Sequence, residues 1–521
     1  MHRIKTKNMK RNISIYILAL AAILITSCNE NFLDLTNESQ LSSDSFWKTK
    51  AQAEQAVIAT YASLQTYSGD KWTFFEELWT GMNYKGDDID NNPAEPYGRE
   101  IANFTVNADN SNILNMWRTW YSTVGRANQV IQRIPEMSAS ELSDDDRNQY
   151  LGEARFLRGL AYMYLVVYFE NIPLVTTFET DETKLYPSQA EPAEVWELVI
   201  SDFLFASQNL PLSYDEANSG RATSLAAKAF LGKAYLATEQ WTLARDMFGS
   251  VVNDPACPYD LVEKYEEIFD GSHENGVESV FEIQFSADRS NGNDERVPLN
   301  YEGVPYELGG WELFYPTQWI VNELKTDLTE DGKYSDRVYG TIFFDDPNST
   351  MYNLDTEEWI SFNDFKELGG QRPYYKKFSY AVDRQYYIGT NLHLMRFADL
   401  LLMYAEALNE TNQTTLAISV VNRVRERSHA APLPLTMNQS QLRTKIRHHE
   451  RPAELSMEMG IRWFDLYRWA KGNSAKEPAK TTLLNHGKPF ASNYTEPKND
   501  IFPIPSYEKN TNHNLEQNPG Y

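Results

Sequence analysis

The chain has 521 residues with 48 basic and 73 acidic side chains, and therefore a formal net charge of −25 at pH 7. A surface this acidic repels phosphate backbones, which excludes a nucleic-acid-binding protein. Apolar residues make up 42% of the chain, as in globular proteins, which excludes a disordered chain. The 12 Trp, 31 Tyr and 25 Phe can serve both a core and a binding surface.

The amino-terminal region has the pattern of an export signal. Residues 1–12 carry five basic and no acidic side chains, and residues 13–25 are nearly all apolar but too few to span a bilayer. The run ends in Leu24-Ile25-Thr26-Ser27-Cys28, which resembles a bacterial lipobox. We therefore expect residues 1–27 to be removed as a signal peptide and Cys28 to carry the lipid, with palmitate among the acyl chains.

The mature chain is expected to be anchored and not membrane-spanning, because several acyl chains hold a protein stably and no later stretch reaches eighteen apolar residues. Residues 28–44 then form a lipidated tether. Removal of residues 1–27 leaves 43 basic against 73 acidic groups, a formal charge of −30. The second cysteine, Cys257, has no disulfide partner once Cys28 is lipidated, and we expect it to be a small buried apolar residue.

Helical periodicity dominates the first half of the mature chain. Apolar residues recur at three- and four-residue spacing, which predicts helices over residues 45–64, 117–134 and 151–169. The clearest repeat covers 231–255, where Leu231, Gly232, Tyr235, Ala244 and Phe248 have the offsets of a tetratricopeptide repeat. Weaker copies surround 159–162 and 404–421. Because stacked pairs of this kind bury a shared core, we expect a helical scaffold.

The middle of the chain loses this periodicity. Gly, Pro, Asp and aromatic residues interrupt every repeat, and only short strand-like runs occur, at 279–285 and 338–344. Helical character returns at Leu392, and a later helix is predicted over 440–459. The mature chain is therefore divided into a helical region at 45–260, a loop-rich insertion at 261–390 and a C-terminal region at 391–521.

Four stretches of the chain, in order, match one known family. They are the lipobox followed by 32–35 and 45–49, the run 152–162, the run 396–407, and the run 450–455 followed by 460–469. The closing segments 502–505 and 517–521 fit as well. In these stretches the chain resembles the SusD/RagB nutrient-uptake outer-membrane lipoproteins of Bacteroidetes, with Pro452 as one small departure.

This resemblance implies a mainly all-α fold, a tetratricopeptide-like superhelix with a loop-rich, irregular half that carries the ligand site. It also implies a lipid-anchored, surface-exposed protein of the outer membrane whose partner is a SusC-type TonB-dependent transporter. Many members of the family bind oligosaccharides. The charged residues of the matching helices, Arg155, Arg158, Arg396 and Asp399, are expected to brace the scaffold, because buried charges are nearly always paired.

Three segments have the composition of a sugar-binding surface, which needs flat aromatic rings flanked by hydrogen-bonding groups. They are residues 71–103, 301–319 and 371–375. The segment 301–319 holds six aromatic residues together with Gly309 and Gly310. The candidate ligand-binding residues are Trp72, Trp79, Tyr84, Asp87, Asn91, Arg99, Tyr306, Trp311, Tyr315 and Arg372.

Metal binding is weakly supported. The run Asp87-Asp88-x-Asp90-Asn91 offers the oxygen ligands that Ca²⁺ favours, but it lacks the full spacing of a calcium loop, so a solvated acidic turn is the preferred interpretation. His448 and His449 lack a metal-ligand spacing. We therefore predict neither a metal nor another cofactor.

The favoured function is capture of an oligosaccharide or polysaccharide and its delivery to the SusC-type transporter, with no catalytic residues. Three alternatives stay open. The cargo could be a peptide, since an acidic surface suits basic peptides. A surface glycoside hydrolase would need two facing carboxylates, and the acids near these segments are Glu76, Glu77, Asp87 and Glu302. A pure protein-binding scaffold would have no need of aromatic loops.

Overall fold

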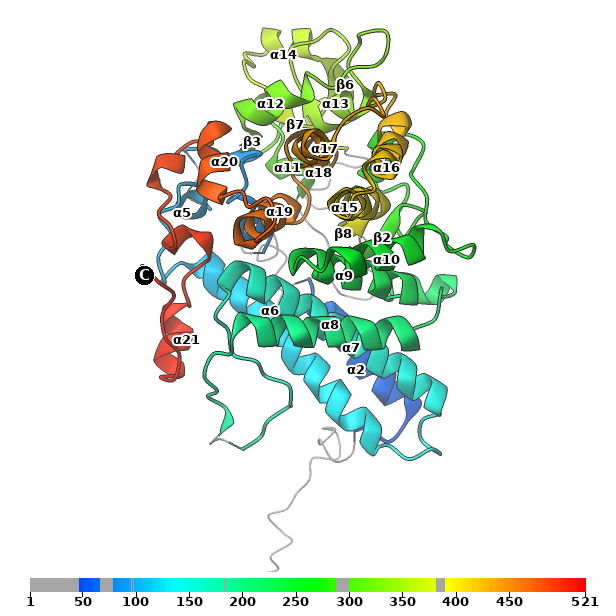
Figure 1. The fold of residues 1–521 in the computed structure, drawn as a ribbon. Helices are drawn as coiled ribbons and strands as arrows, with labels where there is room; N and C mark the ends of the chain where they lie inside the picture. The colour runs from blue at the N-terminus through cyan, green and yellow to red at the C-terminus, as the bar shows by residue number, and fades with distance from the viewer. Residues whose placement is uncertain are drawn as a thin grey trace, which may run out of the picture.

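The computed structural model of the protein places a stack of long helices beneath a smaller lobe of short helices and strands (Figure 1). The structure describes residues 46–65, 78–94, 96, 98–181, 184–286, 299–380 and 389–521. The predicted signal peptide, Cys28, the tether and Trp72 lie outside these residues. In the part of the chain that is described, no helix is both long enough and apolar enough to cross a membrane.

Consecutive helices of the first half lie side by side in chain order. The stack consists of α2 (Lys50–Ala62), α6 (Ser111–Arg133), α7 (Asp144–Phe169), α8 (Pro192–Asn209), α9 (Ser224–Ala237) and α10 (Trp241–Val252), each in contact with the next. It continues through α15 (Phe397–Glu410), which packs on α10, and α16 (Thr414–Arg427). The predicted tetratricopeptide-like, mainly helical fold is confirmed.

Local signals explain where these helices begin and how closely they pack. The Ser143 hydroxyl accepts a hydrogen bond from the Asp146 amide at the start of α7, and three acidic residues in the first turn oppose the positive end of the helix dipole. In α9, a Cβ at Gly232 would lie 2.6 Å from the Phe248 ring of α10. Only glycine therefore lets α9 and α10 approach this closely.

In the described part of the chain, the strands form four two-stranded antiparallel ladders. These are β1 (Ile89–Asn91) with β3 (Phe314–Pro316), β2 (Ser279–Ile283) with β8 (Leu392–Arg396), β4 (Ile342–Phe343) with β7 (Tyr374–Tyr375), and β5 (Thr350–Asn353) with β6 (Glu358–Ser361). The upper lobe also contains α11 (Leu299–Glu302), α12 (Gln318–Leu324), α13 (Asp336–Thr341) and α14 (Phe362–Glu367). A separate apolar cluster that includes Leu308, Met351 and Phe365 gives the lobe a core of its own.

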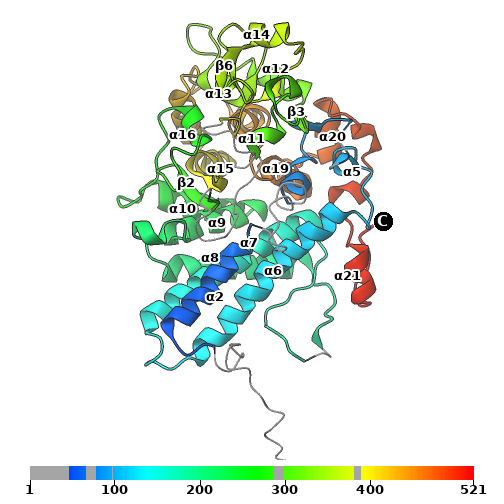
Figure 2. The ribbon, with the colours of Figure 1, turned by 180° about the vertical axis from the view of Figure 1, so that it is seen from behind.

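C-terminal segments connect the lobe to the stack (Figure 2). They are α17 (Gln439–Lys445), a π-helical turn (Ile446–Glu450), α18 (Arg451–Leu455), α19 (Ile461–Lys471), α20 (Ala479–Asn485) and α21 (Ser506–Thr511). Helix α18 contacts α12 and α13 of the lobe and α15 of the stack. The other helical elements among the described residues are the short helices α4 (Thr80–Asn83) and α5 (Arg99–Ala102) and 3-10 turns at Ile134–Glu136, Glu216–Asn218, Tyr265–Ile268, Tyr306–Leu308, Ala491–Asn493 and Lys498–Asp500.

Several predicted elements differ from the structure. The run 338–344, predicted as a strand, is helical in α13 up to Thr341 and forms a strand, β4, only at Ile342 and Phe343, because a short apolar run does not distinguish a strand from a helix. The helix predicted from Leu392 begins at Phe397, since residues 392–396 pair with β2. The helix predicted over 440–459 contains the π-helical turn and ends at Leu455, and the first helix begins at Lys50 after its Thr49 cap.

Charged side chains inside the scaffold are paired, as predicted. Arg158 donates two hydrogen bonds to Asp202, at 2.8 and 2.9 Å. Arg396 binds three glutamates, the nearest pairs being 2.6–2.8 Å apart, and Asp399 lies 2.8 Å from Arg451. Arg155 contacts an aromatic ring where the other three residues contact an opposite charge: its guanidinium lies 4.1 Å from the centre of the Phe205 ring.

The prediction of a buried Cys257 is wrong, because the residue is partly exposed on the loop that follows α10. Its surroundings are nevertheless apolar enough to raise the pKa of the thiol by burial. A raised pKa keeps the thiol protonated and weakly nucleophilic.

Candidate functional site

The three segments proposed for ligand binding meet at one place in the lobe. Strand β1 comes from the first segment and β3 from the second, and in their ladder Asp90 lies opposite Tyr315. The third segment contributes Arg372, whose guanidinium lies 4.3 Å from the centre of the Tyr315 ring. We define the ladder site as Asp90, Tyr306, Trp311, Tyr315 and Arg372.

The loop before β3 is held in one conformation by close backbone contacts. The Trp311 amide donates to the Tyr301 carbonyl at 2.8 Å, and the Glu312 amide donates to the Val304 carbonyl at 2.9 Å. A Cβ at Gly310 would lie 2.2 Å from that same Val304 carbonyl oxygen, so this position requires glycine. Glu312 itself adopts a positive φ of 50°, which is unfavourable for a residue with a side chain and is often found at functional sites.

Glu312 connects the second and third segments. Its carboxylate accepts a hydrogen bond of 3.0 Å from the Tyr374 hydroxyl, and its carbonyl accepts one of 2.9 Å from the Asn92 side chain. Burial is the main cause that raises the pKa of both Tyr315 and Tyr374, and the negative charge of Glu312 is the second cause. Both hydroxyls are therefore neutral at physiological pH and able to donate hydrogen bonds.

The ladder site combines one exposed and one partly buried ring with the exposed Arg372 and the partly exposed Asp90. Tyr306 is 52% exposed, Trp311 is partly buried, and the guanidinium of Arg372 covers the otherwise buried Tyr315. Burial raises the pKa of the Asp90 carboxyl, although Lys488 and Arg372 oppose the effect. This arrangement can stack an apolar ring face on Trp311 or Tyr306 while Arg372 donates hydrogen bonds to hydroxyl groups.

Four other candidate residues lie beside or beneath the ladder site. Trp79 and Tyr84 are each 1% exposed and pack against Phe314, with ring centres 4.9 and 6.5 Å apart. Asn91 is buried in β1, and the partly buried Arg99 donates to the Pro93 carbonyl at 2.8 Å. Trp79, Tyr84 and Asn91 support the ladder from its inner side.

Asp87 is a structural brace in this structure. Its carboxylate accepts hydrogen bonds from the Arg462 guanidinium at 2.6 and 2.8 Å, and His486 lies 2.7 Å away. Burial alone would raise the pKa of Asp87, but Arg462 and His486 outweigh it and hold the pKa well below its ordinary value. The Asp87 side chain is buried and bound by these partners, so it has no exposed surface for a ligand. Asp87 is therefore not part of the ladder site.

The same geometry bears on the calcium alternative. Both carboxylate oxygens of Asp87 bind cationic partners, and the Asp88 carboxylate accepts a hydrogen bond of 3.0 Å from the Met457 amide. These carboxylates therefore face the interior and are not free to converge on a cation. Within the described ranges, no group of three or more His, Cys, Asp or Glu side chains could hold a metal ion.

Two residues beside the ladder site, Glu312 and Tyr374, lie in the proposed segments but are not among the candidate ligand-binding residues, because neither has an individual signal in the sequence. Glu312 stands out only as an acid between Trp311 and Phe314, and nothing in the spacing links it to Tyr374, 62 residues later. The contact depends on β4 pairing with β7, which brings Tyr374 beside the loop.

Comparisons with known proteins agree with this architecture. A sequence model described as the SusD family matches residues 277–521, and one described as starch-binding associating with outer membrane matches residues 31–236. SusD-like protein P2 of Formosa agariphila is 28% identical over 98% of this chain and 100% of the relative. A SusD-like protein of Bacteroides ovatus is 24% identical over 87% of this chain and 82% of the relative.

Solved structures with the same fold include a SusD superfamily protein from Bacteroides vulgatus, with a TM-score of 0.78 and 24% identity over 91% of this chain and 100% of that one. A laminarin binding SusD-like protein has a TM-score of 0.70 and 23% identity over the same shares. Surface glycan-binding protein A from Bacteroides thetaiotaomicron, solved in complex with laminarihexaose, has a TM-score of 0.70 and 20% identity over 90% of this chain and 99% of that one. The chain belongs to the SusD-like family.

Proposed function

We propose that this protein binds a glycan at the ladder site and delivers it to a SusC-type TonB-dependent transporter of the outer membrane, without altering the glycan chemically. The observation that carries the proposal is the meeting of the two aromatic segments in the β1–β3 ladder, with Arg372 stacked on Tyr315. Relatives of the same fold that are described as laminarin binding or as glycan-binding proteins support it.

The cellular part of the proposal rests on the sequence and the family. One matching family model is described as associating with the outer membrane, and the lipobox supports a lipid anchor at Cys28.

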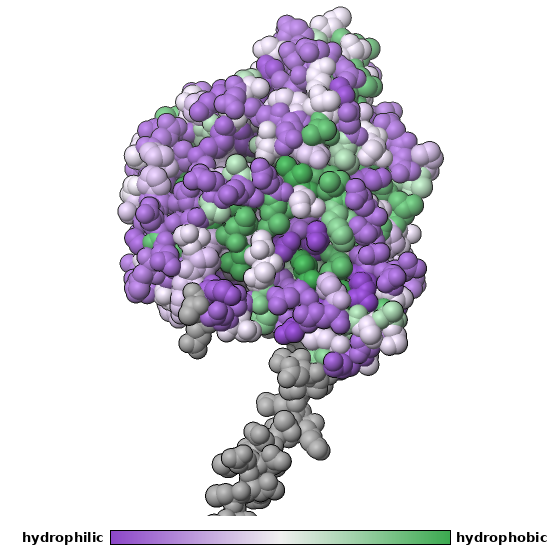
Figure 3. Space-filling view, turned by 60° about the horizontal axis from the view of Figure 1, so that its bottom comes forward, coloured by the Kyte–Doolittle hydropathy of each residue, from purple (hydrophilic) through white to green (hydrophobic). Residues whose placement is uncertain are grey.

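Figure 3 shows apolar residues gathered in a hollow on the face turned forward from the bottom of Figure 1, within a mostly hydrophilic surface. Exposed apolar side chains of the helical half include Leu204 and Leu243. Because exposed apolar patches mark interaction sites, we assign the transporter contact to the helical half.

Calorimetric titration can test the binding function. The full chain would be purified in lauryldimethylamine oxide, because a maltoside detergent would itself present a sugar. Laminarihexaose, maltohexaose, cellohexaose and xylohexaose would be titrated in turn, with hexalysine as the basic-peptide probe. We expect one of the glycans to bind, and we expect Trp311→Ala to weaken its binding by about tenfold or more, since an aromatic platform is lost.

Trp359→Ala provides the matched control. Trp359 is 49% exposed on β6 and lies outside the ladder site, so its removal should leave glycan affinity unchanged. Loss of binding in Trp359→Ala but not in Trp311→Ala would move the site elsewhere in the lobe. Binding of hexalysine and of no glycan would favour a peptide cargo.

Release of reducing ends from the bound glycan would test the hydrolase alternative. Of the acids first considered, Asp87 is engaged by Arg462 and Glu302 is 1% exposed. Glu76 and Glu77 lie outside the described residues. Asp90 belongs to the ladder site and Glu312 lies beside it, so turnover that disappears in Asp90→Asn or Glu312→Gln would establish an enzyme. We expect no turnover.

A further inference from the structure

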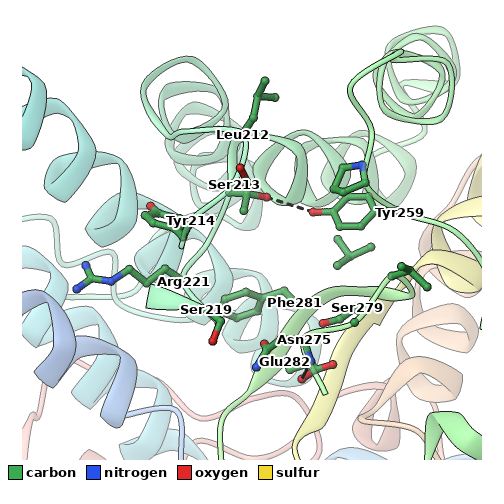
Figure 4. Close-up of a pocket in the computed structure, with 16 residues that line it drawn as sticks. Leu212, Ser213, Tyr214, Ser219, Arg221, Tyr259, Asn275, Ser279, Phe281 and Glu282 are labelled. Carbon is green, nitrogen blue, oxygen red and sulfur yellow. Dashed lines mark hydrogen bonds between the residues drawn. The ribbon is translucent and has the colours of Figure 1, made fainter. Parts of the chain in front are cut away.

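A groove on the helical half shares no residue with the ladder site. It consists of two adjacent cavities, of 340 and 510 Å³, which have Ser219, Gly220, Arg221 and Glu282 in common. The first cavity lies between the loop that precedes α9, Tyr259 and β2 (Figure 4), and the second lies against the C-terminal half of α2. We call the two cavities together the side groove. Their volumes are those of small-ligand sites.

The charges that line the side groove are already paired inside the protein. Arg221 binds Glu54 and Glu153, at 2.5 and 3.2 Å. Figure 4 shows its guanidinium directed away from the first cavity. Glu282 lies 2.9 Å from His393, and its carboxylate accepts a hydrogen bond from Asn391. A charged ligand would have to compete with these buried pairs, so the lining favours a neutral ligand.

The walls combine aromatic, aliphatic and hydroxyl groups. Phe281 forms the floor of the first cavity between Tyr214 and Tyr259 (Figure 4). Burial raises the pKa of Tyr259 to about 12, so its hydroxyl, 3.1 Å from the Thr223 hydroxyl, is neutral. Leu212 and Val277 are each 47% exposed at the rim. Apolar faces beside neutral hydroxyls match the two kinds of surface that a sugar ring presents.

The segment between the two cavities is fixed in place. Gly220 has a positive φ of 84°, and a Cβ there would lie 2.5 Å from the Gln284 side chain. Two residues later, the Ala222 amide donates to the Tyr61 hydroxyl at 2.9 Å. The side groove is therefore formed before any ligand arrives, which reduces the entropic cost of binding.

We propose that the side groove is a second binding site for neutral sugar units. A long glycan, or two short ones, would then contact the lobe and the helical half at separate places. The proposal extends the glycan-binding function proposed above, but each site can fail without the other.

Hydrogen–deuterium exchange on the full chain separates the two sites. Exchange would be followed at 301–316 and at 212–223 with saturating laminarihexaose, maltohexaose, cellohexaose or xylohexaose. With at least one of these probes, we expect exchange in both segments to slow, by about tenfold at the best protected amides. Ser219→Trp should fill the side groove and abolish protection at 212–223 only, whereas Trp311→Ala should abolish it at 301–316 only.

Ser250→Trp is the control, because Ser250 is exposed on α10 outside the lining. Val277→Trp, at the opposite rim, replaces Ser219→Trp if that variant melts at a lower temperature than the native protein. The second site is overturned if no probe protects 212–223, if filling the groove leaves that protection unchanged, or if Trp311→Ala removes protection from both segments. Protection at 212–223 without any at 301–316 would retain the side groove and reject the ladder site.

Discussion

Asp87 places a negative charge in the interior, where Arg462 and His486 bind both of its carboxylate oxygens. Asp87→Asn keeps the shape of the side chain but leaves the buried guanidinium without its counter-charge. We expect the free energy of unfolding to fall by about 3 kcal/mol, as when one partner of a buried pair is removed. Urea denaturation at pH 7 measures the change.

The exposed Asp246→Asn variant is the control for Asp87→Asn, with an expected change of no more than about 0.5 kcal/mol. Glycan affinity should persist in both variants, since neither carboxylate faces the ladder site. Equal stabilities of Asp87→Asn and the native protein would show that Arg462 does not depend on Asp87.

Composition identified segments that meet in the structure, but it did not distinguish exposed residues from core residues within them. Aromatic and polar side chains mark both loops, and those loops do meet in the β1–β3 ladder. Yet Trp79 and Trp311 look alike in a sequence, and only packing against Phe314 makes the first a core residue. Asp87 and Asp90 differ in the same way, because the partners of Asp87 lie 375 and 399 residues away along the chain. Such distant contacts leave no local pattern.

At the scale of helices, Gly232 and Gly125 provide opposite tests of the packing argument. A Cβ at Gly232 would meet the buried Phe248 ring at 2.6 Å, whereas a Cβ at Gly125 in α6 would have nothing within 4 Å. We expect Gly232→Ala to destabilise the protein by about 1–3 kcal/mol through overpacking. Gly125→Ala should stabilise it by about 0.5–1 kcal/mol, because alanine loses less backbone entropy in a helix.

The urea concentrations at which the two variants are half unfolded compare their stabilities directly, because both variants replace a helical glycine by alanine. Shifts of the same sign would contradict the proposed role of Gly232 in bringing α9 and α10 together. A stabilising Gly232→Ala would mean that Phe248 can move aside.

Long periodic helices could be predicted from the sequence, and short elements could not. The pair α9–α10 follows from the spacing of its apolar and small residues. By contrast, residues 392–409 are buried throughout, with apolar and charged residues on both sides of Phe397, so the change from β8 to α15 has no signal in hydropathy. It is set by the pairing of β8 with β2, whose residues lie more than 100 positions earlier.

Across the whole molecule, a network of buried ion pairs joins the lobe to the helical stack. Arg337 of α13 binds Asp327 in the lobe and Glu450 in the C-terminal segments. Glu454 of α18 binds Arg396 at the end of β8, directly before α15, and Arg427 at the end of α16. The orientation of the lobe, and with it the ladder site, therefore depends on carboxylates that remain ionised inside the protein.

This dependence predicts acid sensitivity. Burial alone would raise the pKa of Glu406 and Glu454, but neighbouring arginines outweigh it and lower both values to about 2. A carboxyl whose pKa is lower in the folded state contributes stability above its unfolded pKa, and loses it as the pH falls toward the folded pKa. We therefore expect the free energy of unfolding to fall from about pH 4.5 to pH 2, by about 3 kcal/mol for each of these two groups.

Between pH 7 and 5 the expected change is small and of opposite sign, because protonation of surface acids relieves the repulsion of a chain with a net charge of −25. Urea denaturation at pH 7, 5, 4 and 3 measures the profile. Glu406→Gln should lower stability at pH 7 and flatten the acid limb, since its titrating group is gone while Arg468 keeps only one of its two carboxylate partners, Asp465. A native profile that stays level from pH 5 to pH 3 would contradict the prediction, because ionisation of the buried carboxylates would then contribute nothing to the stability of the fold.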